Sequence, residues 1–329
     1  MTVLDAIVAL IFNAILNGTP LMFGTMGEIL TEKSGNLNLG VEGMMYMGGA
    51  FGIAGAYYYE KAAGGAVSGS LAILIALLCA FLAGAFGALC YGFVTITLRA
   101  NQNVTGLALA ILGTGVGQFV GEYMRLHEGG YVAVSNALKD RFQNPVFPEF
   151  LQNIPVVGKI VFGHNLFVYL GILTAVVMTV YFNKTRSGLN LRAVGESPAT
   201  ADAAGINITR VKYLSTVIGG GISAIGGMVY IMTIAGCVWN HEGLAGEGWL
   251  AVALVIFCLW RPLNAVWGSA LFGALMILYM RVHLPIPDEI YKILPYAVTI
   301  IVLVITSMRR KKEDHPPESL GIAYFREER

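Results

Sequence analysis

Three glutamate side chains stand within or beside long apolar stretches of this sequence: Glu28, Glu42 and Glu247. A carboxylate is costly to bury in apolar surroundings, so each is a candidate for contact with a polar solute. The alternative interpretation is that each carboxylate caps a helix or faces water at the edge of the apolar region. The residue types alone leave both roles open.

Uncharged side chains near the same stretches form a second group of candidates. The amides of Asn38, Asn103 and Gln118 can line a polar pathway, or they can hydrogen-bond to a neighbouring helix. The indole of Trp249 could stack on a planar ligand. Tryptophan also gathers where a membrane meets water, and this second interpretation is the favoured one for Trp249.

No catalytic motif accompanies these candidates. The sequence contains no G-x-x-x-x-G-K-[ST] stretch, so it has no P-loop of its own for ATP. His127 and His241 are each followed by Glu, but neither has the second His that a zinc-protease motif requires four positions later. Ser223 lacks the glycine that follows a nucleophile-elbow serine two positions on. We therefore expect no enzyme, no catalytic residues, no metal and no cofactor.

The elements that position the candidates are expected to be membrane helices. The chain is 56% hydrophobic and 12% charged, whereas soluble domains carry about 25% charged residues. Apolar runs recur along its length, which predicts an all-α polytopic membrane protein with about nine transmembrane helices, some of them broken or re-entrant. The expected spans are 6–29, 44–59, 71–98, 104–121, 165–182, 213–237, 249–260, 265–280 and 293–308. Small residues four positions apart predict close helix packing at Gly84, Ala88, Gly92, Gly113, Gly117 and Gly121.

Two polar, glycine-containing stretches interrupt this pattern, at 34–43 and 239–248, and each contains one of the glutamates. Non-helical backbone at membrane depth is tolerated only where it is buried in protein or lines an aqueous cavity. The interruptions occupy roughly corresponding places in the two halves of the chain. They therefore predict a substrate pathway between the halves, with these candidate residues: Asn38, Glu42, Asn103, Gln118, Glu247 and Trp249.

A longer polar segment, 183–212, lies between two apolar runs and contains a short helix pattern of its own. Ser197 can cap the N-terminus of this helix, Pro198 suits its first position and Gly205 suits its end. A compact capped helix in a membrane protein is either an ordered surface loop or a docking site. On the residues alone both interpretations stay open.

The placement of Lys and Arg predicts the orientation of the chain. With the C-terminus in the cytoplasm and nine crossings, these basic positions lie inside: Lys33, Arg99, the 183–212 segment, Arg261 and 309–312. The long loop 122–163 and the N-terminus then lie outside. We expect a transmembrane domain over 1–312 and a charged cytoplasmic tail over 313–329.

Four stretches resemble one family in particular, the nucleoside and simple-sugar permeases of ABC importers, which belong with the ribose and branched-chain amino-acid permeases. The first and most specific is GEILTEKSGNLNLGVEGMM at 27–45. The others are LRAVGESP at 191–198, AAGI at 203–206, and GEGW at 246–249 continuing to WRPL at 260–263. Together they extend over nearly the whole chain in order.

This resemblance implies a type II-like ABC importer permease. Such a subunit moves nucleosides, or a related small polar solute such as a simple sugar, across the bacterial inner membrane. It also implies that the 183–212 segment carries the coupling helix, which docks on a separate ATP-binding subunit. The coupling residues carried over from the family are Gly195, Glu196, Ser197, Pro198, Ala201, Ala204 and Gly205.

The resemblance also implies partners. They are the ABC ATP-binding subunit, a second permease subunit, an extracytoplasmic substrate-binding lipoprotein and membrane lipid, and no nucleic acid is expected. This chain resembles the shorter member of a permease heterodimer. Two other classes remain as alternatives: a stand-alone secondary transporter or channel, and a structural subunit. The second predicts that changes at Glu42 and Glu247 leave transport untouched.

Overall fold

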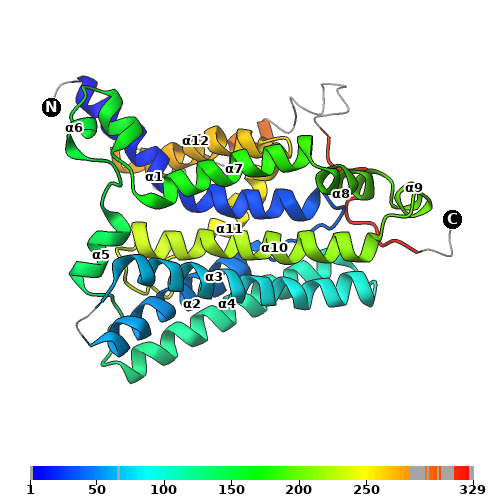
Figure 1. The fold of residues 1–329 in the computed structure, drawn as a ribbon, viewed down its shortest axis with the longest axis horizontal. Coiled ribbons are helices and arrows are strands. Elements are labelled where there is room, and N and C mark those ends of the chain that lie inside the picture. The colour runs from blue at the N-terminus through cyan, green and yellow to red at the C-terminus, as the bar shows by residue number, and fades with distance from the viewer. Residues whose placement is uncertain are drawn as a thin grey trace.

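The computed structural model describes residues 3–64, 67–281, 293–294, 296–301, 304 and 315–325, and the regular elements in this part are helices. In the same part of the chain, β-structure is limited to an isolated bridge between Ala133 and Val238. The long helices run side by side, with the N-terminus at one end of the molecule and the C-terminus at the other (Figure 1). The chain is therefore an elongated helical bundle.

Within the described residues, five helical segments are long and apolar enough to cross a membrane. They are α1 (Val3–Glu32), α3 (Gly69–Gly92) with the π-helical turn η1 (Phe93–Thr97), α4 (Gln102–His127), α7 (Leu166–Lys184), and α10 (Ile208–Val229) with η3 (Tyr230–Ile234). The same part of the chain contains three further bundle helices: α2 (Val41–Ala63), α11 (Glu247–Phe257) and α12 (Pro262–Arg281). The predicted class, an all-α polytopic membrane protein, is confirmed, and part of the expected ninth span at 293–308 lies outside the described residues.

Several helices continue beyond the predicted apolar spans. α4 ends at His127 instead of 121, and α2 ends at Ala63 instead of 59. The apolar run marks only the part of a helix that suits lipid, whereas the backbone hydrogen-bond ladder can continue into polar sequence. The short helix α11 has 11 residues, as its brief apolar run predicts, and is too short to cross a bilayer alone.

Glycines allow α2, α3, α4 and α10 to approach one another closely. A Cβ atom added at Gly227 of α10 would lie 1.8 Å from the carbonyl oxygen of Met45 in α2. A Cβ at Gly113 of α4 would lie 2.7 Å from backbone atoms of Gly43. One at Gly84 of α3 would lie 2.4 Å from the carbonyl oxygen of Gly220. The glycine ridges predicted from the four-residue spacing are thus confirmed as helix-packing surfaces.

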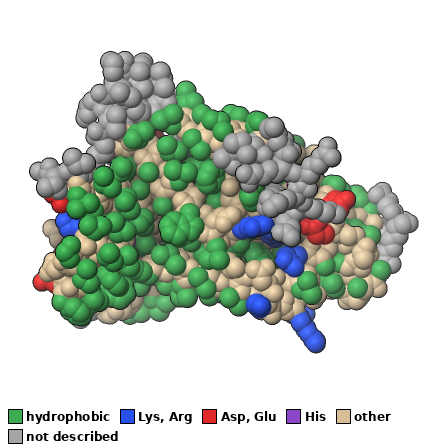
Figure 2. Space-filling view, turned by 90° about the horizontal axis from the view of Figure 1, so that it is seen from above, with side chains coloured by type: hydrophobic (Ala, Val, Ile, Leu, Met, Phe, Trp, Pro, Cys, Tyr) green, Lys and Arg blue, Asp and Glu red, His purple; other side chains and the backbone are tan. Residues whose placement is uncertain are grey.

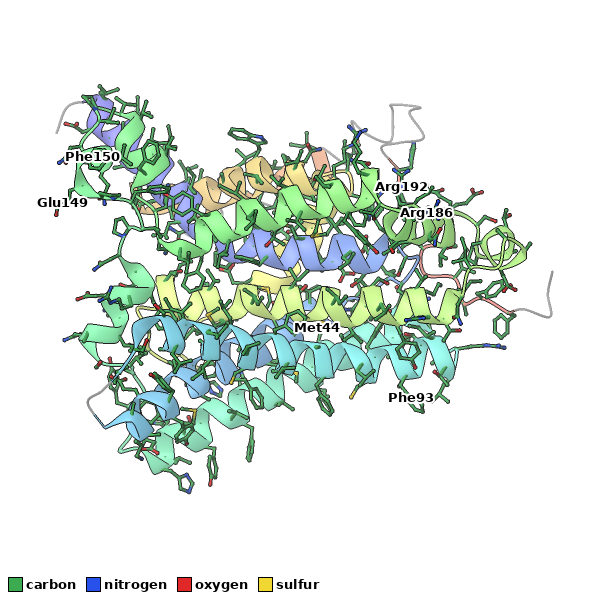
Figure 3. All side chains as sticks on the ribbon, viewed as in Figure 1. Met44, Phe93, Glu149, Phe150, Arg186 and Arg192 are labelled. Atoms are coloured by element: carbon green, nitrogen blue, oxygen red, sulfur yellow. The ribbon has the colours of Figure 1, made fainter. Side chains whose placement is uncertain are left out.

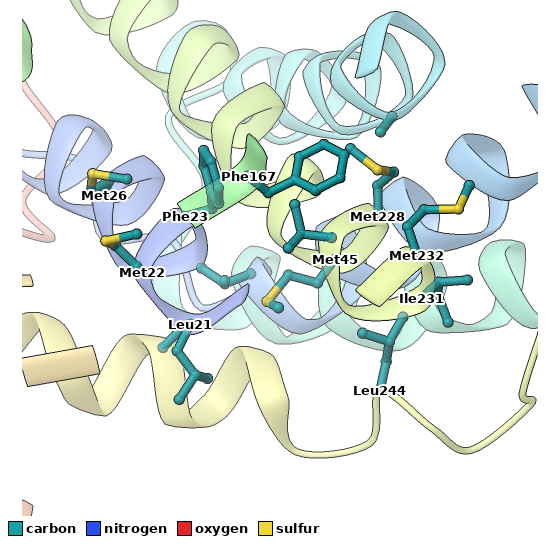
Figure 4. Close-up of a cluster of buried hydrophobic side chains, with 14 of the residues drawn as sticks. Leu21, Met22, Phe23, Met26, Met45, Phe167, Met228, Ile231, Met232 and Leu244 are labelled. Atoms are coloured by element: carbon teal, nitrogen blue, oxygen red, sulfur yellow. The ribbon is translucent and has the colours of Figure 1, made fainter. Parts of the chain in front are cut away.

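The main core lies where α1, α2, α7 and α10 meet, and methionine contributes much of it (Figure 4). The unbranched thioether side chain fills irregular gaps between helices, which suits a bundle with broken elements. Figure 4 labels these members of the cluster: Leu21, Met22, Phe23, Met26, Met45, Phe167, Met228, Ile231, Met232 and Leu244.

At the end of the bundle that carries the N-terminus, the connection from α4 to α7 contains three short helical segments. They are α5 (Asn136–Gln143), α6 (Glu149–Gln152) and the π-helical turn η2 (Gly158–Phe162). Leu138 and Phe142 of α5 are buried in the main core. The Lys61 ammonium lies 2.6 Å from the Glu128 carboxylate, and this ion pair joins the end of α2 to the end of α4.

Candidate functional site

Glu42 in the first turn of α2 joins the two interruptions of the helical pattern. Its carboxylate oxygens accept hydrogen bonds from the backbone N–H groups of Gly246 and Gly248, both at 2.7 Å, and of Trp249 at 3.3 Å. The first turn of a helix leaves its N–H groups without intrahelical partners and favours a nearby negative charge. Glu42 therefore caps α11, a helix some 200 residues further along the chain.

The contact is close because no side chain stands between the two backbones. A Cβ atom at Gly248 would lie 2.3 Å from the Cα atom of Glu42. The polar stretches 34–43 and 239–248, expected to correspond in the two halves, thus meet at the N-termini of α2 and α11. The two helix starts are therefore in direct contact.

Glu247, the first residue of α11, lies beside this junction and is 5% exposed. Its Oε2 atom has no hydrogen-bond partner among the described residues, and the same is true of the buried indole nitrogen of Trp239. A buried polar atom without a partner costs about 1–3 kcal/mol, so such atoms indicate a place where water or a polar solute binds. Glu247 and Trp239 both belong to the second interruption, 239–248.

Two of the other predicted pathway residues belong to the same region. The Gln118 side-chain nitrogen, on α4, donates to the carbonyl oxygen of His241 at 3.4 Å, which places Gln118 against the second interruption. Trp249 follows Glu247 in the first turn of α11, and its side chain is 37% exposed. Residues from three separate parts of the sequence therefore contact the second interruption: Glu42, Gln118, and the pair Glu247 and Trp249.

The remaining two pathway candidates are Asn38 and Asn103. Asn38 is buried and stabilises the loop between α1 and α2, because its N–H donates to the Glu28 carboxylate at 3.1 Å. Its side-chain oxygen accepts from the N–H of Gly40 at 2.9 Å. Asn103 is exposed in the first turn of α4. Asn38 thus belongs to the first interruption but bonds within the α1–α2 loop, and Asn103 lies at the start of α4.

A further buried contact was missed by sequence reasoning. Glu32 is 3% exposed, and one of its carboxylate oxygens accepts a hydrogen bond from the indole nitrogen of Trp260. Glu28 and Glu32 stand four residues apart and are both buried, so they occupy the same face of α1. That spacing was the available signal, because two carboxylates on the inward face of an apolar helix need partners inside the bundle.

The 183–212 segment forms two helices instead of one: α8 (Arg186–Glu196) and α9 (Pro198–Ala203). The predicted caps of the second helix are confirmed. The Ser197 hydroxyl accepts from the backbone of Thr200 at 3.4 Å, and Gly205 adopts the left-handed φ of +82°. α8 was not predicted, although Thr185 caps it, accepting from Gly188 at 3.0 Å.

The seven expected coupling residues are divided between a buried and an exposed surface. Ala201 is 3% exposed and packs in a small cluster with Val194 and Ile208, and Gly195 is also buried. Glu196, Ala204 and Gly205 are exposed, and Ser197 and Pro198 lie between these extremes. The helix pair is therefore packed against the bundle through one side and open on the other.

The described part of the C-terminal tail, 315–325, packs against this helix pair. Ser319 donates its N–H to the carbonyl oxygen of Gly195 at 3.0 Å, and Gly321 donates to that of Gly35 at 3.3 Å. The Tyr324 hydroxyl donates to the Asp202 carboxylate at 2.9 Å. In Figure 1 the segment passes beside α8 and α9 at the end of the bundle opposite the N-terminus. The tail thus connects α9, α8 and the α1–α2 loop.

We expect Tyr324→Phe to loosen α9, because it removes the one hydroxyl bond between the tail and Asp202. A hydrogen bond of this kind contributes about 1 kcal/mol, so amide hydrogen exchange in α9 should become about fivefold faster. Tyr131→Phe is the matched control, since Tyr131 is 65% exposed in the loop after α4. Equal exchange rates in α9 for both variants would show that the tail does not restrain this helix.

The fold and these contacts define a class of protein: a membrane-embedded helical bundle in which broken helices meet in the interior and a capped helix pair projects at one end. The sequence matches the family described as branched-chain amino acid transport system / permease component over residues 10–303. The chain belongs to this family. It is a membrane permease subunit of an ABC transporter, a class that works with an ATPase and a substrate-binding protein.

Three relatives are similar over most of their length. The chain is 33% identical to TsgC13 of Haloferax volcanii, named as a glucose ABC transporter permease protein, over 80% of this chain and 74% of that one. It is 30% identical to the nucleoside ABC transporter permease protein NupC of Lactococcus lactis, over 93% and 94% of the two chains. It is also 30% identical to the guanosine ABC transporter permease protein NupQ of Bacillus subtilis, over the full length of both.

Proposed function

We propose that this chain forms part of the translocation pathway of a bacterial inner-membrane importer, and that the solute passes the junction of α2 and α11. The observation that carries this proposal is the Glu42 carboxylate bound to the N-terminus of α11. It holds two broken helices against each other beside Glu247, whose Oε2 atom has no hydrogen-bond partner among the described residues. A moving helix start at this position would open or close a polar passage.

The solute we propose is a nucleoside, with a simple sugar as the second candidate. The relatives are named for a nucleoside, guanosine and glucose, all of which present several hydroxyl groups. Hydroxyl groups can donate to the Glu247 oxygen that has no partner among the described residues. The partly exposed ring of Trp249 offers a stacking surface that a nucleobase uses better than a sugar does.

We propose that α9 is the coupling helix and that its exposed side docks on the ATPase subunit. Support comes from the exposure of Glu196, Ala204 and Gly205, and from α8, α9 and the tail sharing one end of the bundle (Figure 1). This end would be cytoplasmic, the loop between α4 and α7 would be external, and a substrate-binding lipoprotein would dock there. The second permease subunit would be a different chain.

The test is purification with a tag on the N-terminus, because the C-terminal segment packs on α8 and α9. We expect an ATPase and a second permease to co-purify, and the complex in liposomes to take up labelled guanosine only with ATP. An excess of glucose should reduce the uptake of labelled guanosine only weakly. Uptake by the isolated chain, driven by an ion gradient, would contradict the proposal and favour the stand-alone transporter.

A further inference from the structure

A cavity of about 440 Å³ lies at the start of α10, towards the end of the bundle that carries α8 and α9. Its lining comes from the α1–α2 loop, η1 and the residues after it, the start of α4, the segment from α9 to α10, and the tail. Figure 3 places Phe93, where η1 begins, towards the same end. None of the lining residues belongs to the Glu42 junction, and the volume suits a small ligand.

A buried ammonium group forms one side of this cavity. Lys212 of α10 lines the cavity and is 4% exposed. Its side chain forms no salt bridge and no hydrogen bond with the described residues. A buried cation without a partner is costly, and buried charges in proteins are normally paired. The ammonium of Lys212 therefore calls for a negatively charged partner that reaches it through the cavity.

The α1–α2 loop contributes a second unpartnered group. Asn36 lines the cavity and is 1% exposed, and its Oδ1 atom has no hydrogen-bond partner among the described residues. Its side-chain nitrogen donates to the Thr216 hydroxyl at 2.9 Å. Thr216 follows Lys212 by four residues, so both lie on the same face of α10. An acceptor and a cationic donor without partners therefore lie next to each other at one cavity.

The N-terminus of α10 adds backbone donors to the same lining. Ile208 and Thr209 are the first two residues of this 22-residue helix, and both line the cavity. The first N–H groups of a helix have no intrahelical partners, and together with the helix dipole they favour a bound anion. The Asn207 side chain caps the N–H of Arg210 and leaves those of Ile208 and Thr209 to other acceptors.

The other charged side chains of the lining already have contacts. The exposed guanidinium of Arg99 lies 4.7 Å from the centre of the Phe325 ring in the tail. The Asp202 carboxylate accepts a hydrogen bond from the Tyr324 hydroxyl. On one face of the molecule, Lys and Arg side chains gather towards this end, whereas hydrophobic side chains cover most of the rest (Figure 2). The buried groups without partners are thus Lys212 and Asn36, and they decide which ligand fits.

We propose that this cavity binds a small phosphate-bearing anion, with phosphate oxygens at the Lys212 ammonium and the N-terminus of α10 and a ligand hydroxyl group donating to Asn36. A free phosphate ion and the phosphate ester of a hydroxylated solute share this chemistry. Water alone would satisfy Asn36 but would leave the charge of Lys212 without a partner. Since Gly205 and Ile206 also line the cavity, a bound anion would join the end of α9 to α10.

The experiment measures binding of labelled phosphate and labelled glucose 6-phosphate to the purified permease complex by equilibrium dialysis, with glucose as the uncharged probe. Lys212→Met removes the ammonium but keeps a long side chain, and should weaken binding of both anions at least about tenfold. The matched control is Arg210→Met on the same helix, because Arg210 is exposed and does not line the cavity. This control should bind both anions as the unchanged protein does.

A second variant tests the proposal if Lys212→Met does not fold. Asn36→Asp places a carboxylate near Lys212, where it would pair with the ammonium and repel phosphate, so binding should again fall at least about tenfold. In the unchanged protein, either anion should also slow amide hydrogen exchange over residues 204–209, and in both variants this protection should be lost.

The two anions distinguish the sources of the ligand. Tighter binding of glucose 6-phosphate than of phosphate would identify a phosphate ester as the occupant, and equal binding would identify free phosphate. Equal anion binding by the unchanged protein, Lys212→Met and Asn36→Asp would overturn the proposal, because the anions would then bind elsewhere in the complex. Binding of glucose as tight as that of glucose 6-phosphate would show that charge does not select the ligand. No binding of either anion would show that the cavity holds only water.

Discussion

Glu42→Ala is expected to abolish uptake and to destabilise the folded protein. The substitution removes the acceptor of three backbone N–H groups at the start of α11, those of Gly246, Gly248 and Trp249. Buried donors that lose a charged acceptor cost about 1.5–3 kcal/mol each, and because such losses are not additive we expect a total of roughly 3–5 kcal/mol. Thermal unfolding in detergent and ATP-driven uptake in liposomes measure the two effects.

Glu42→Gln should have effects on stability and uptake that lie between those of the unchanged protein and those of Glu42→Ala. The amide keeps the shape and one acceptor oxygen, but its nitrogen is a donor and would face a backbone N–H that is also a donor. We therefore expect clear but incomplete destabilisation and reduced uptake. A second comparison uses Glu247, the neighbouring glutamate at the start of α11.

Glu247→Gln is the matched comparison, because one carboxylate oxygen of Glu247 has no hydrogen-bond partner among the described residues. Replacing that oxygen by an amide nitrogen breaks no contact there, so thermal stability should change by less than about 1 kcal/mol. A change in the KM of uptake would then show that Glu247 contacts the solute. Normal uptake by Glu42→Ala and Glu247→Gln alike would refute the pathway and support a structural subunit.

Features that depend on local pattern could be predicted from the sequence. The helix interruptions, the ridge at Gly113 and the cap of α9 at Ser197 follow from residues within a few positions of one another. Their physical cause is local, since small side chains permit close packing and a serine oxygen satisfies nearby N–H groups. The same logic would have revealed α8, whose buried residues Leu191 and Val194 stand three apart.

Contacts between distant segments could not be predicted in the same way. Glu42 was identified as a candidate, but its partner lies at Gly248, and nothing in the local sequence of either residue specifies the other. The hydrogen bonds between Glu32 and Trp260 and between Ser319 and Gly195 also join residues that are far apart in the sequence. Each depends on which helices become neighbours, and a single sequence does not state that order. The sequence therefore identifies candidate residues such as Glu42 more readily than the partners to which they bond.

The described part of the tail contacts the proposed coupling helix α9 and the end of α8. Sequence reasoning treats 313–329 as a charged extension, yet Tyr324 and Ser319 bond to α9 and to the end of α8. A coupling helix must transmit force, and a helix as short as α9 has little stability of its own. We infer that the packing of Ala201 and the tail contacts together supply the stiffness that the helix lacks.

Gly205→Pro is expected to eliminate ATP-driven uptake without preventing membrane insertion. Gly205 ends α9 with a φ of +82°, and its N–H donates to the carbonyl oxygen of Asp202 at 2.9 Å. Proline fixes φ near −65° and has no N–H, so both features of this helix end are lost. Insertion depends on the apolar helices, which the substitution does not touch.

Two milder substitutions separate backbone conformation from side-chain size. No atom lies within 4 Å of a Cβ placed at Gly205, so bulk alone should have no effect there. Asn tolerates the left-handed conformation and should support nearly normal uptake, whereas Ala costs about 1–2 kcal/mol and should reduce it partly. Uptake and retention of the ATPase should therefore decrease in the order Gly, Asn, Ala and Pro. Normal coupling in the proline variant would show that energy reaches the pathway through another part of the chain.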